Sequence, residues 1–148
     1  ILHKTSEKKY ITILRDPVDR VFSYFNMSLN DKNQPYHYLA KKSIFHFLKY
    51  CPEAQNIYCK YLSSDNEKDI NSDLYQLAEK NLNNFDTIIR FDNFENDVKK
   101  FIEKFNISNI EIPHINKSNY KRKISNDELK AIQFYNSYDI KLINRFKD

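Results

Sequence analysis

Length, composition and charge indicate a chain with one modest core and a weakly basic surface. Its 148 residues are 41% hydrophobic and carry a formal net charge of +4. This size suits one domain, and we expect residues 1–148 to form a single domain. The sequence lacks the run of about eighteen apolar residues that a transmembrane helix needs, and residues 1–9 lack the apolar stretch of a signal peptide. The charge is compatible with an anionic ligand but does not identify one.

The chain contains no glycine, whereas average usage is about 7%. Glycine supplies positive φ and close approach of the backbone to phosphates, so a glycine-rich phosphate loop is excluded. Turns must depend on Asn, Asp, Ser and Pro. Cys51 and Cys59 are predicted to be free thiols. Two cysteines and four scattered histidines predict no metal site.

The first regular elements are a strand and a helix joined at an arginine. Residues 10–14 are β-branched, aromatic or apolar, which predicts a buried strand. Arg15 follows at its carboxyl end, where open α/β sheets bind ligands. Asp16 suits a helix cap and Pro17 the first helical position. Apolar residues recur at helical spacing at Val18, Val21, Phe22 and Phe25. Ser23 falls off this stripe, so Arg15, Ser23 and the helix start can form an anion site.

The remaining pattern alternates helices with loops and adds one more strand. Helices are predicted over residues 38–50, 53–62, 72–83 and 92–105, with a break at Pro52 and loops at residues 26–35 and 63–71. Residues 85–91 predict a second strand, and Asp92 suits the cap of the helix after it. Ser125 and Glu128 form a capping-box pattern before a helix that runs to the C-terminus, with an interruption within residues 136–139. Two strands joined by helices predict an α/β fold with a small parallel sheet.

The run Arg15-Asp16-Pro17-Val18-Asp19-Arg20-Val21-Phe22-Ser23 resembles the 3′-phosphate-binding signature of sulfotransferases that use 3′-phosphoadenosine 5′-phosphosulfate (PAPS). The likeness is to the carbohydrate type that includes uronosyl 2-O-sulfotransferases and their bacterial relatives. In that family an Arg and a Ser eight residues apart hold the 3′-phosphate, which implies this role for Arg15 and Ser23. An ordinary strand–helix junction with Arg15 paired to a nearby aspartate is the alternative.

Two further blocks are similar to the family and occur in its order. Residues 78–101 resemble its helix, strand and acidic-aromatic turn, although Arg90 stands near the family's usual Thr-Glu pair. The segment Ile112-Pro113-His114-Ile115-Asn116-Lys117-Ser118 resembles its nucleotide-covering loop. The resemblance implies nucleotide contacts from Asn116, Lys117 and Ser118, and substrate contacts from Gln55 and His114. For Gln55, an exposed helical glutamine without a function is also compatible.

The resemblance implies the helix-rich, C-terminal majority of a P-loop-like sulfotransferase domain. Its function would be transfer of a sulfuryl group from PAPS to a hydroxyl of a saccharide or polysaccharide, without a metal. The catalytic base stays unassigned, and Lys4-Thr5-Ser6 is rejected as the 5′-phosphosulfate loop because no strand precedes it. The location expected is cytoplasmic in a bacterium, or the Golgi lumen in a eukaryote with an upstream anchor.

Two other functions stay open at this point. A non-catalytic module that binds 3′-phosphoadenosine 5′-phosphate (PAP), or a scaffold, would keep the same 3′-phosphate site. A nucleic-acid binder would use the basic and aromatic run Tyr120-Lys121-Arg122-Lys123. The aromatics elsewhere fall on predicted helical core faces, so we expect no nucleic-acid partner and no stable insertion into a membrane.

Overall fold

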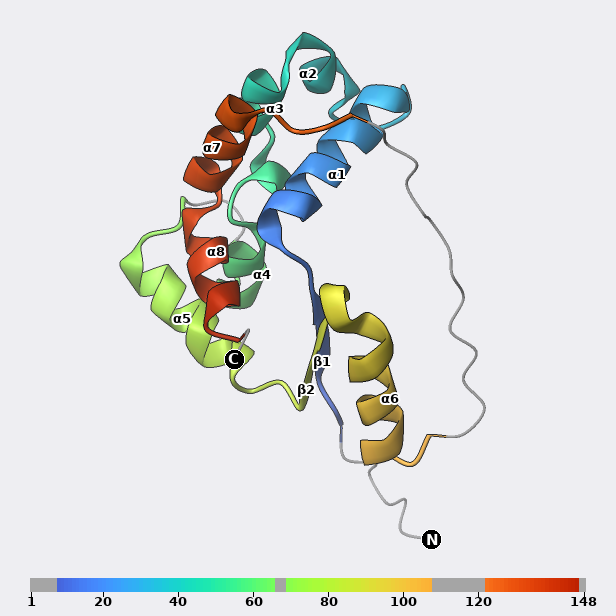
Figure 1. Ribbon diagram of the computed structural model, residues 1–148. Helices are drawn as coiled ribbons and strands as arrows, with labels where there is room; N and C mark the ends of the chain where they lie inside the picture. Colours follow the sequence, from blue (N-terminus) through green and yellow to red (C-terminus); the bar gives the residue numbers. More distant parts are fainter. Residues whose placement is uncertain (1–7, 66–68, 108–121, 147–148) are drawn as a thin grey trace, which may run out of the picture.

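The protein is mostly helical and contains one small parallel sheet (Figure 1). The computed structural model describes residues 8–65, 69–107 and 122–146. In chain order its elements are β1 (Ile11–Leu14), α1 (Pro17–Asn30), α2 (His37–Lys42), α3 (Ile44–Tyr50), the 3₁₀ helix η1 (Pro52–Ala54), α4 (Ile57–Ser63), α5 (Ser72–Leu82), β2 (Thr87–Arg90), the 3₁₀ helix η2 (Phe91–Asn93), α6 (Phe94–Lys104), α7 (Asn126–Tyr135) and α8 (Ser137–Asn144).

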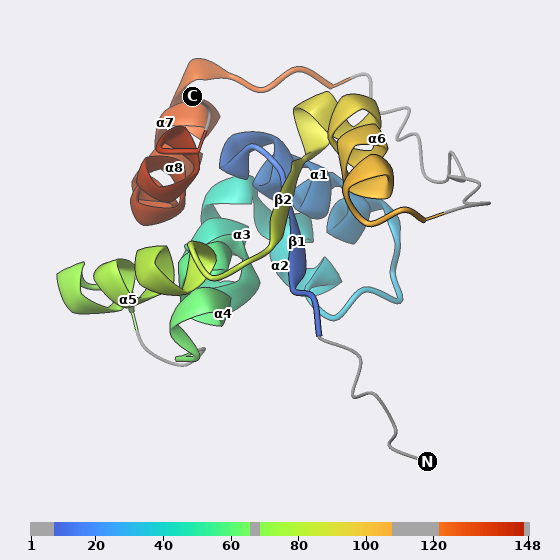
Figure 2. The same cartoon turned by 90° about the horizontal axis from the view of Figure 1, so that it is seen from below.

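The two strands pair in parallel, as predicted, with Ile11 opposite Thr87 and Leu14 opposite Arg90. Helix α6 lies on one side of the sheet, and α4, α5 and α8 lie on the other (Figures 1 and 2). Because side chains alternate along a strand, Leu14 faces the second group of helices and is buried among them. Ile11 and Ile13 occupy the opposite face and are 40% and 51% exposed. The sheet is therefore covered unevenly.

Apolar side chains gather in two clusters. One joins α1, α2, α3 and α7 around Val21, Phe25, Phe47 and Ile132, which are all buried. The other joins β1, α4, α5 and α8, and its buried members include Leu14, Cys59, Tyr75, Leu82 and Leu142. Both cysteines are free thiols, as predicted, and both are buried. The second cluster includes Leu14, the last residue of β1, so it anchors the carboxyl end of that strand.

Three helix boundaries differ from the prediction because polar side chains bond to the backbone. Helix α1 extends through residues 26–30, since the Asn26 and Asn30 amides donate to carbonyls four residues earlier in the helix. The helix predicted over residues 38–50 is divided at Ser43, whose hydroxyl caps α3 by accepting from His46 N–H. The helix predicted over residues 53–62 is divided at Asn56, which has a left-handed φ of 46°.

The second half of the chain follows the prediction more closely. The capping box of Ser125 and Glu128 is present at the start of α7, and the predicted interruption lies at Asn136, between α7 and α8. The strand predicted over residues 85–91 is shorter, as β2. Asp92 does not cap α6: it lies in η2, Asn93 precedes the helix, and Asp97 instead accepts from the backbone and guanidinium of Arg90.

Candidate functional site

Arg15 lies immediately after β1, at the carboxyl end of the parallel pair, as predicted. Its backbone N–H donates to the Tyr58 hydroxyl at 3.1 Å. Its guanidinium lies 5.0 Å from the centre of the Phe91 ring, which follows β2. That ring is 52% exposed. Cation–π contact with Phe91 and the bond to Tyr58 thus hold Arg15 between the ends of the two strands.

The start of α1 lies directly beside Arg15. The Asp16 carboxylate accepts from Val18 N–H at 2.9 Å and from Asp19 N–H at 3.2 Å, and Pro17 occupies the first helical position. Both features were predicted from the sequence. They place Arg15 beside a helix start whose first N–H groups already donate to Asp16, so Arg15 and not the helix start offers donors to an anion here.

A small cleft adjoins Arg15 and is lined by residues of both strands, of the segments that follow them and of the end of α8: Leu14, Arg15, Asp16, Ile88, Arg90, Asp92, Ile143 and Phe146. Its volume is about 20 Å³, enough for roughly one water molecule. Ser23 is half-buried in α1 and does not line this cleft. Convergence of Arg15 and Ser23 on one anion therefore stays a prediction.

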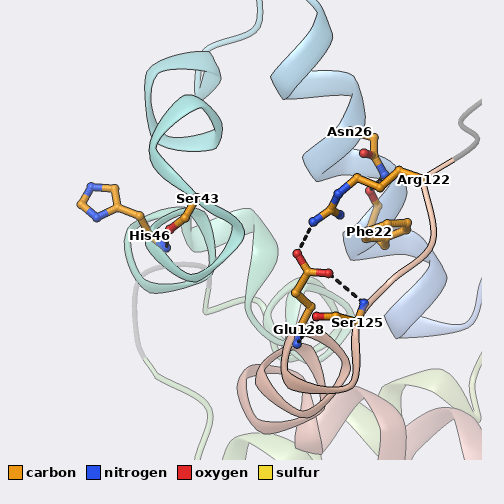
Figure 3. A network of polar contacts seen from close by, with 7 residues as sticks. All are labelled: Phe22, Asn26, Ser43, His46, Arg122, Ser125 and Glu128. Atoms are coloured by element: carbon orange, nitrogen blue, oxygen red, sulfur yellow. Dashed lines mark hydrogen bonds and ion pairs between the residues drawn. The ribbon is translucent and has the colours of Figure 1, made fainter.

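The described chain resumes at Arg122 against the part of α1 that carries Ser23. The Arg122 guanidinium lies 5.3 Å from the Phe22 ring centre and pairs with the Glu128 carboxylate (Figure 3). Glu128 also accepts from Ser125 N–H at 2.9 Å. Burial opposes ionisation of Glu128, but the bonds from Ser125 and Arg122 outweigh it and keep the pKa of this carboxyl below its ordinary value. This network fixes residues 122–125 next to α1.

The other predicted site residues divide into two groups. His114, Asn116, Lys117 and Ser118 lie outside the described residues. Gln55 is described, and its amide donates to Leu48 O at 2.6 Å and Lys49 O at 3.2 Å. Both carbonyls belong to the last turn of α3, so the Gln55 amide caps the end of that helix.

Sequence reasoning missed Arg20, a residue of α1 whose side chain contacts η1 and α4. Its Nη1 donates to Glu53 O at 3.0 Å, and its guanidinium lies 5.5 Å from the Tyr58 ring centre. Burial lowers the pKa of Arg20, while the charge of Asp139 acts in the opposite direction. Two buried guanidinium nitrogens, Nε and Nη2, have no hydrogen-bond partner within the described parts of the chain. The sequence showed Arg20 only as one residue of the first motif. Its contacts could not be predicted, because Glu53 and Tyr58 are distant in the sequence.

Comparison with family models, with curated proteins and with solved structures finds no match for this chain. In the ranges 8–65, 69–107 and 122–146, no three His, Cys, Asp or Glu side chains gather as metal ligands would. None of the helices described there is long and apolar enough to cross a membrane. The sulfotransferase resemblance thus depends on the three sequence blocks alone.

Proposed function

We propose that this chain is the 3′-phosphate-binding part of a PAPS-dependent carbohydrate sulfotransferase with a P-loop-like fold. The observation that carries the proposal is the position of Arg15, between a parallel strand and a helix start capped by Asp16. The first motif requires this arrangement. The acceptor would be a hydroxyl of a saccharide or polysaccharide.

In this proposal Arg15 holds the 3′-phosphate of the nucleotide beside the start of α1. Its guanidinium offers a planar fork of donors, whereas the first N–H groups of α1 are already bonded to Asp16. Ser23 contributes a hydroxyl from the same helix, after a side-chain rearrangement that opens the small cleft. The exposed Phe91 ring, already beside Arg15, offers a face on which a purine can stack.

The third sequence block would complete the nucleotide site. Arg122 is fixed on α1 beside Phe22, and an extended chain of four residues (to Ser118) or five residues (to Lys117) reaches at most about 14 or 18 Å. That reach is sufficient for Lys117 and Ser118 to approach a phosphate held at Ser23. We expect amide exchange across residues 115–123 to slow on addition of PAP. Unchanged exchange at saturating PAP would exclude this segment from the site.

Calorimetric titration with PAP, and with adenosine 5′-phosphate as the ligand that lacks the 3′-phosphate, tests the proposal. Arg15→Ala should weaken PAP binding by about 1.5–3 kcal/mol and Ser23→Ala by about 0.5–1.5 kcal/mol, the usual values for charged and neutral hydrogen bonds. Arg145→Ala is the matched control, because Arg145 pairs with Glu79 at another surface. Equal affinity for the two nucleotides would contradict the proposal.

A non-catalytic PAP-binding module is the second candidate. It needs only the 3′-phosphate site of Arg15 and Ser23, whereas a sulfotransferase also needs charge stabilisation at the reacting end of the nucleotide, for which no residue is assigned here. Incubation with radiolabelled PAPS and a panel of polysaccharides separates the two candidates. Labelled polysaccharide supports the enzyme, whereas PAP binding without transfer supports the module.

A further inference from the structure

A groove of about 560 Å³ opens where the starts of α4 and α8 meet the end of α7. Its volume is within the range of small-molecule sites. Charged, amide, hydroxyl and aromatic side chains line it together, among them Lys49, Gln55, Lys60, Phe134, Ser137 and Tyr138. One carboxylate, that of Asp69, also lines it beside the two lysines. The groove is separate from the cleft at Arg15, because the two lie at opposite ends of α8, about 10 Å apart along its axis.

Lys60 is the first feature of the groove that indicates a ligand. Its side chain is charged, yet the residue is only 4% exposed. Its Nζ donates to Pro52 O at 3.4 Å, and this is its single hydrogen bond within the described residues. An ammonium has three donors, and burial of a charge is costly unless it is paired. An anionic group in the groove would supply the missing acceptor.

Phe134 is the second feature. It is 76% exposed, more than any other large hydrophobic residue among those described. Its ring meets Tyr135 edge to face, with 5.4 Å between ring centres, so the neighbouring tyrosine restricts its orientation. The face of an aromatic ring is negative and attracts the weakly positive C–H groups on the face of a sugar. The nearby Ser137 hydroxyl can bond to hydroxyl groups of the same ligand.

We propose that this groove binds an acidic saccharide. A sugar ring lies on Phe134, and its carboxylate or sulfate bonds to the ammonium of Lys60, with Lys49 adding positive charge at the rim. Binding of an acidic saccharide depends on the groove residues alone. Use of the groove to hold an acceptor chain during sulfuryl transfer rests on the proposed function. The groove then positions the chain, while the nucleotide is held at Arg15.

The experiment is a titration of the full chain with trigalacturonate, a uronate trisaccharide, and with neutral maltotriose, followed by calorimetry and amide NMR shifts. We expect trigalacturonate to shift signals of the groove residues and maltotriose to bind much more weakly.

Lys60→Met keeps the apolar stem and removes the charge, so affinity should fall about tenfold or more. Phe134→Ala should reduce affinity about two- to tenfold without affecting folding, because the ring is exposed. Lys42→Met and Tyr38→Ala are controls from α2, where both residues are exposed.

Each outcome decides the inference. No shift in the groove at millimolar trigalacturonate, or an unchanged affinity of Phe134→Ala, overturns it. Equal binding of maltotriose overturns the role of Lys60, and equal binding of triglutamate overturns the assignment to saccharides. PAP titration of the same samples tests the proposed function separately. Saccharide binding without PAP binding keeps the groove and rejects the nucleotide site, whereas the reverse result rejects the groove alone.

Discussion

The side chain of Asn56, the residue just before α4, caps the start of α8, and the side chain of Asp139 in α8 caps the start of α4. The Asn56 side-chain oxygen accepts from Tyr138 N–H and Asp139 N–H, both at 3.1 Å, at the start of α8. The Asp139 carboxylate accepts from Tyr58 N–H at 3.0 Å and Cys59 N–H at 2.9 Å, at the start of α4. Four backbone donors that helix starts leave without partners are thereby satisfied. The two helices therefore begin at one shared point, which lies at the groove lined by Asn56 and Tyr138.

Replacement of Asn56 should destabilise the protein for two reasons. Asn56→Ala removes the cap of α8, worth about 0.5–2 kcal/mol, and places a Cβ without a polar partner in the left-handed conformation, at about 1–2 kcal/mol. Asn56→Gly removes the cap but tolerates the positive φ, so it should cost less than Asn56→Ala. Urea unfolding of both variants measures the difference. Equal losses for Ala and Gly would show that backbone conformation contributes nothing at this position.

The Asp139 carboxyl predicts a particular pH dependence of stability. Burial raises its pKa, although hydrogen bonds from Cys59 and Tyr58 and the charge of Arg20 act in the opposite direction. In the unfolded chain an aspartate titrates near about 3.9. The folded state holds the proton more strongly, so the contribution of this group to stability is present at low pH and is lost as pH rises from about 4 through the folded pKa.

Asp139→Asn is the matched variant, because it keeps an acceptor oxygen and does not titrate. The free energy of unfolding of the wild type, minus that of Asp139→Asn, should decrease as pH rises from about 3.5 to 7. Urea unfolding at a series of pH values measures this difference, in which the other titrating groups largely cancel. An increase over the same range would mean that the hydrogen bonds outweigh burial and that the folded pKa is lowered.

Several features that involve close neighbours in the sequence were predicted correctly, although the Ser43 cap of α3 was missed and Asp92 does not cap α6. The Asp16 cap, Pro17 at the helix start and the box of Ser125 and Glu128 each involve partners at most three residues apart. The parallel pairing followed from two apolar runs separated by helices. Arg15 was placed correctly at a strand end, because the strand signal and the helix signal leave no room between them for a longer loop.

Features that involve distant partners could not be predicted. The left-handed turn at Asn56 depends on hydrogen bonds to residues 80 and more positions away. The Tyr58 hydroxyl that holds Arg15 is 43 residues away, and the Phe91 ring comes from the other strand. The first motif indicated an anion site, but its pattern contained no information on the cleft volume or on the neighbours of Ser23. Those depend on packing between α1, α8 and the two strand ends.

The ion pair of Glu128 with Arg122 should stabilise the protein above acidic pH. The folded pKa of Glu128 is lowered by the Ser125 and Arg122 bonds, which outweigh burial. Its contribution is therefore present above the unfolded pKa of about 4.3 and is lost as pH falls through the folded pKa.

Glu128→Gln should lose about 0.5–1.5 kcal/mol at pH 7, as for a partly exposed charged hydrogen bond. The difference between the variant and the wild type should shrink as pH falls below about 4 and vanish below the folded pKa. Thermal unfolding at the two pH values measures this, and an equal loss at both would contradict the electrostatic origin.

The last prediction concerns the outer edge of β1, and it starts from the pairing of the sheet. Within the described residues β1 pairs with β2 alone, so one edge of β1 keeps backbone groups without strand partners, and such edges template association. The exposed Ile11 and Ile13 add an apolar face to this edge. We expect concentration-dependent self-association, measured by sedimentation velocity over a dilution series.

Ile13→Lys should shift the protein to the monomer at the same concentrations, because a charged side chain on an edge strand opposes pairing. The folded state should tolerate this change, since half of the Ile13 side chain is already in water. Leu77→Lys is the control, because Leu77 is a similarly exposed apolar residue at 40% but lies on α5, away from the strand edge. Two results would contradict the prediction: a wild-type protein that stays monomeric throughout the series, or equal loss of association in the two lysine variants. The second result would show that general surface charge, and not the β1 edge, controls association.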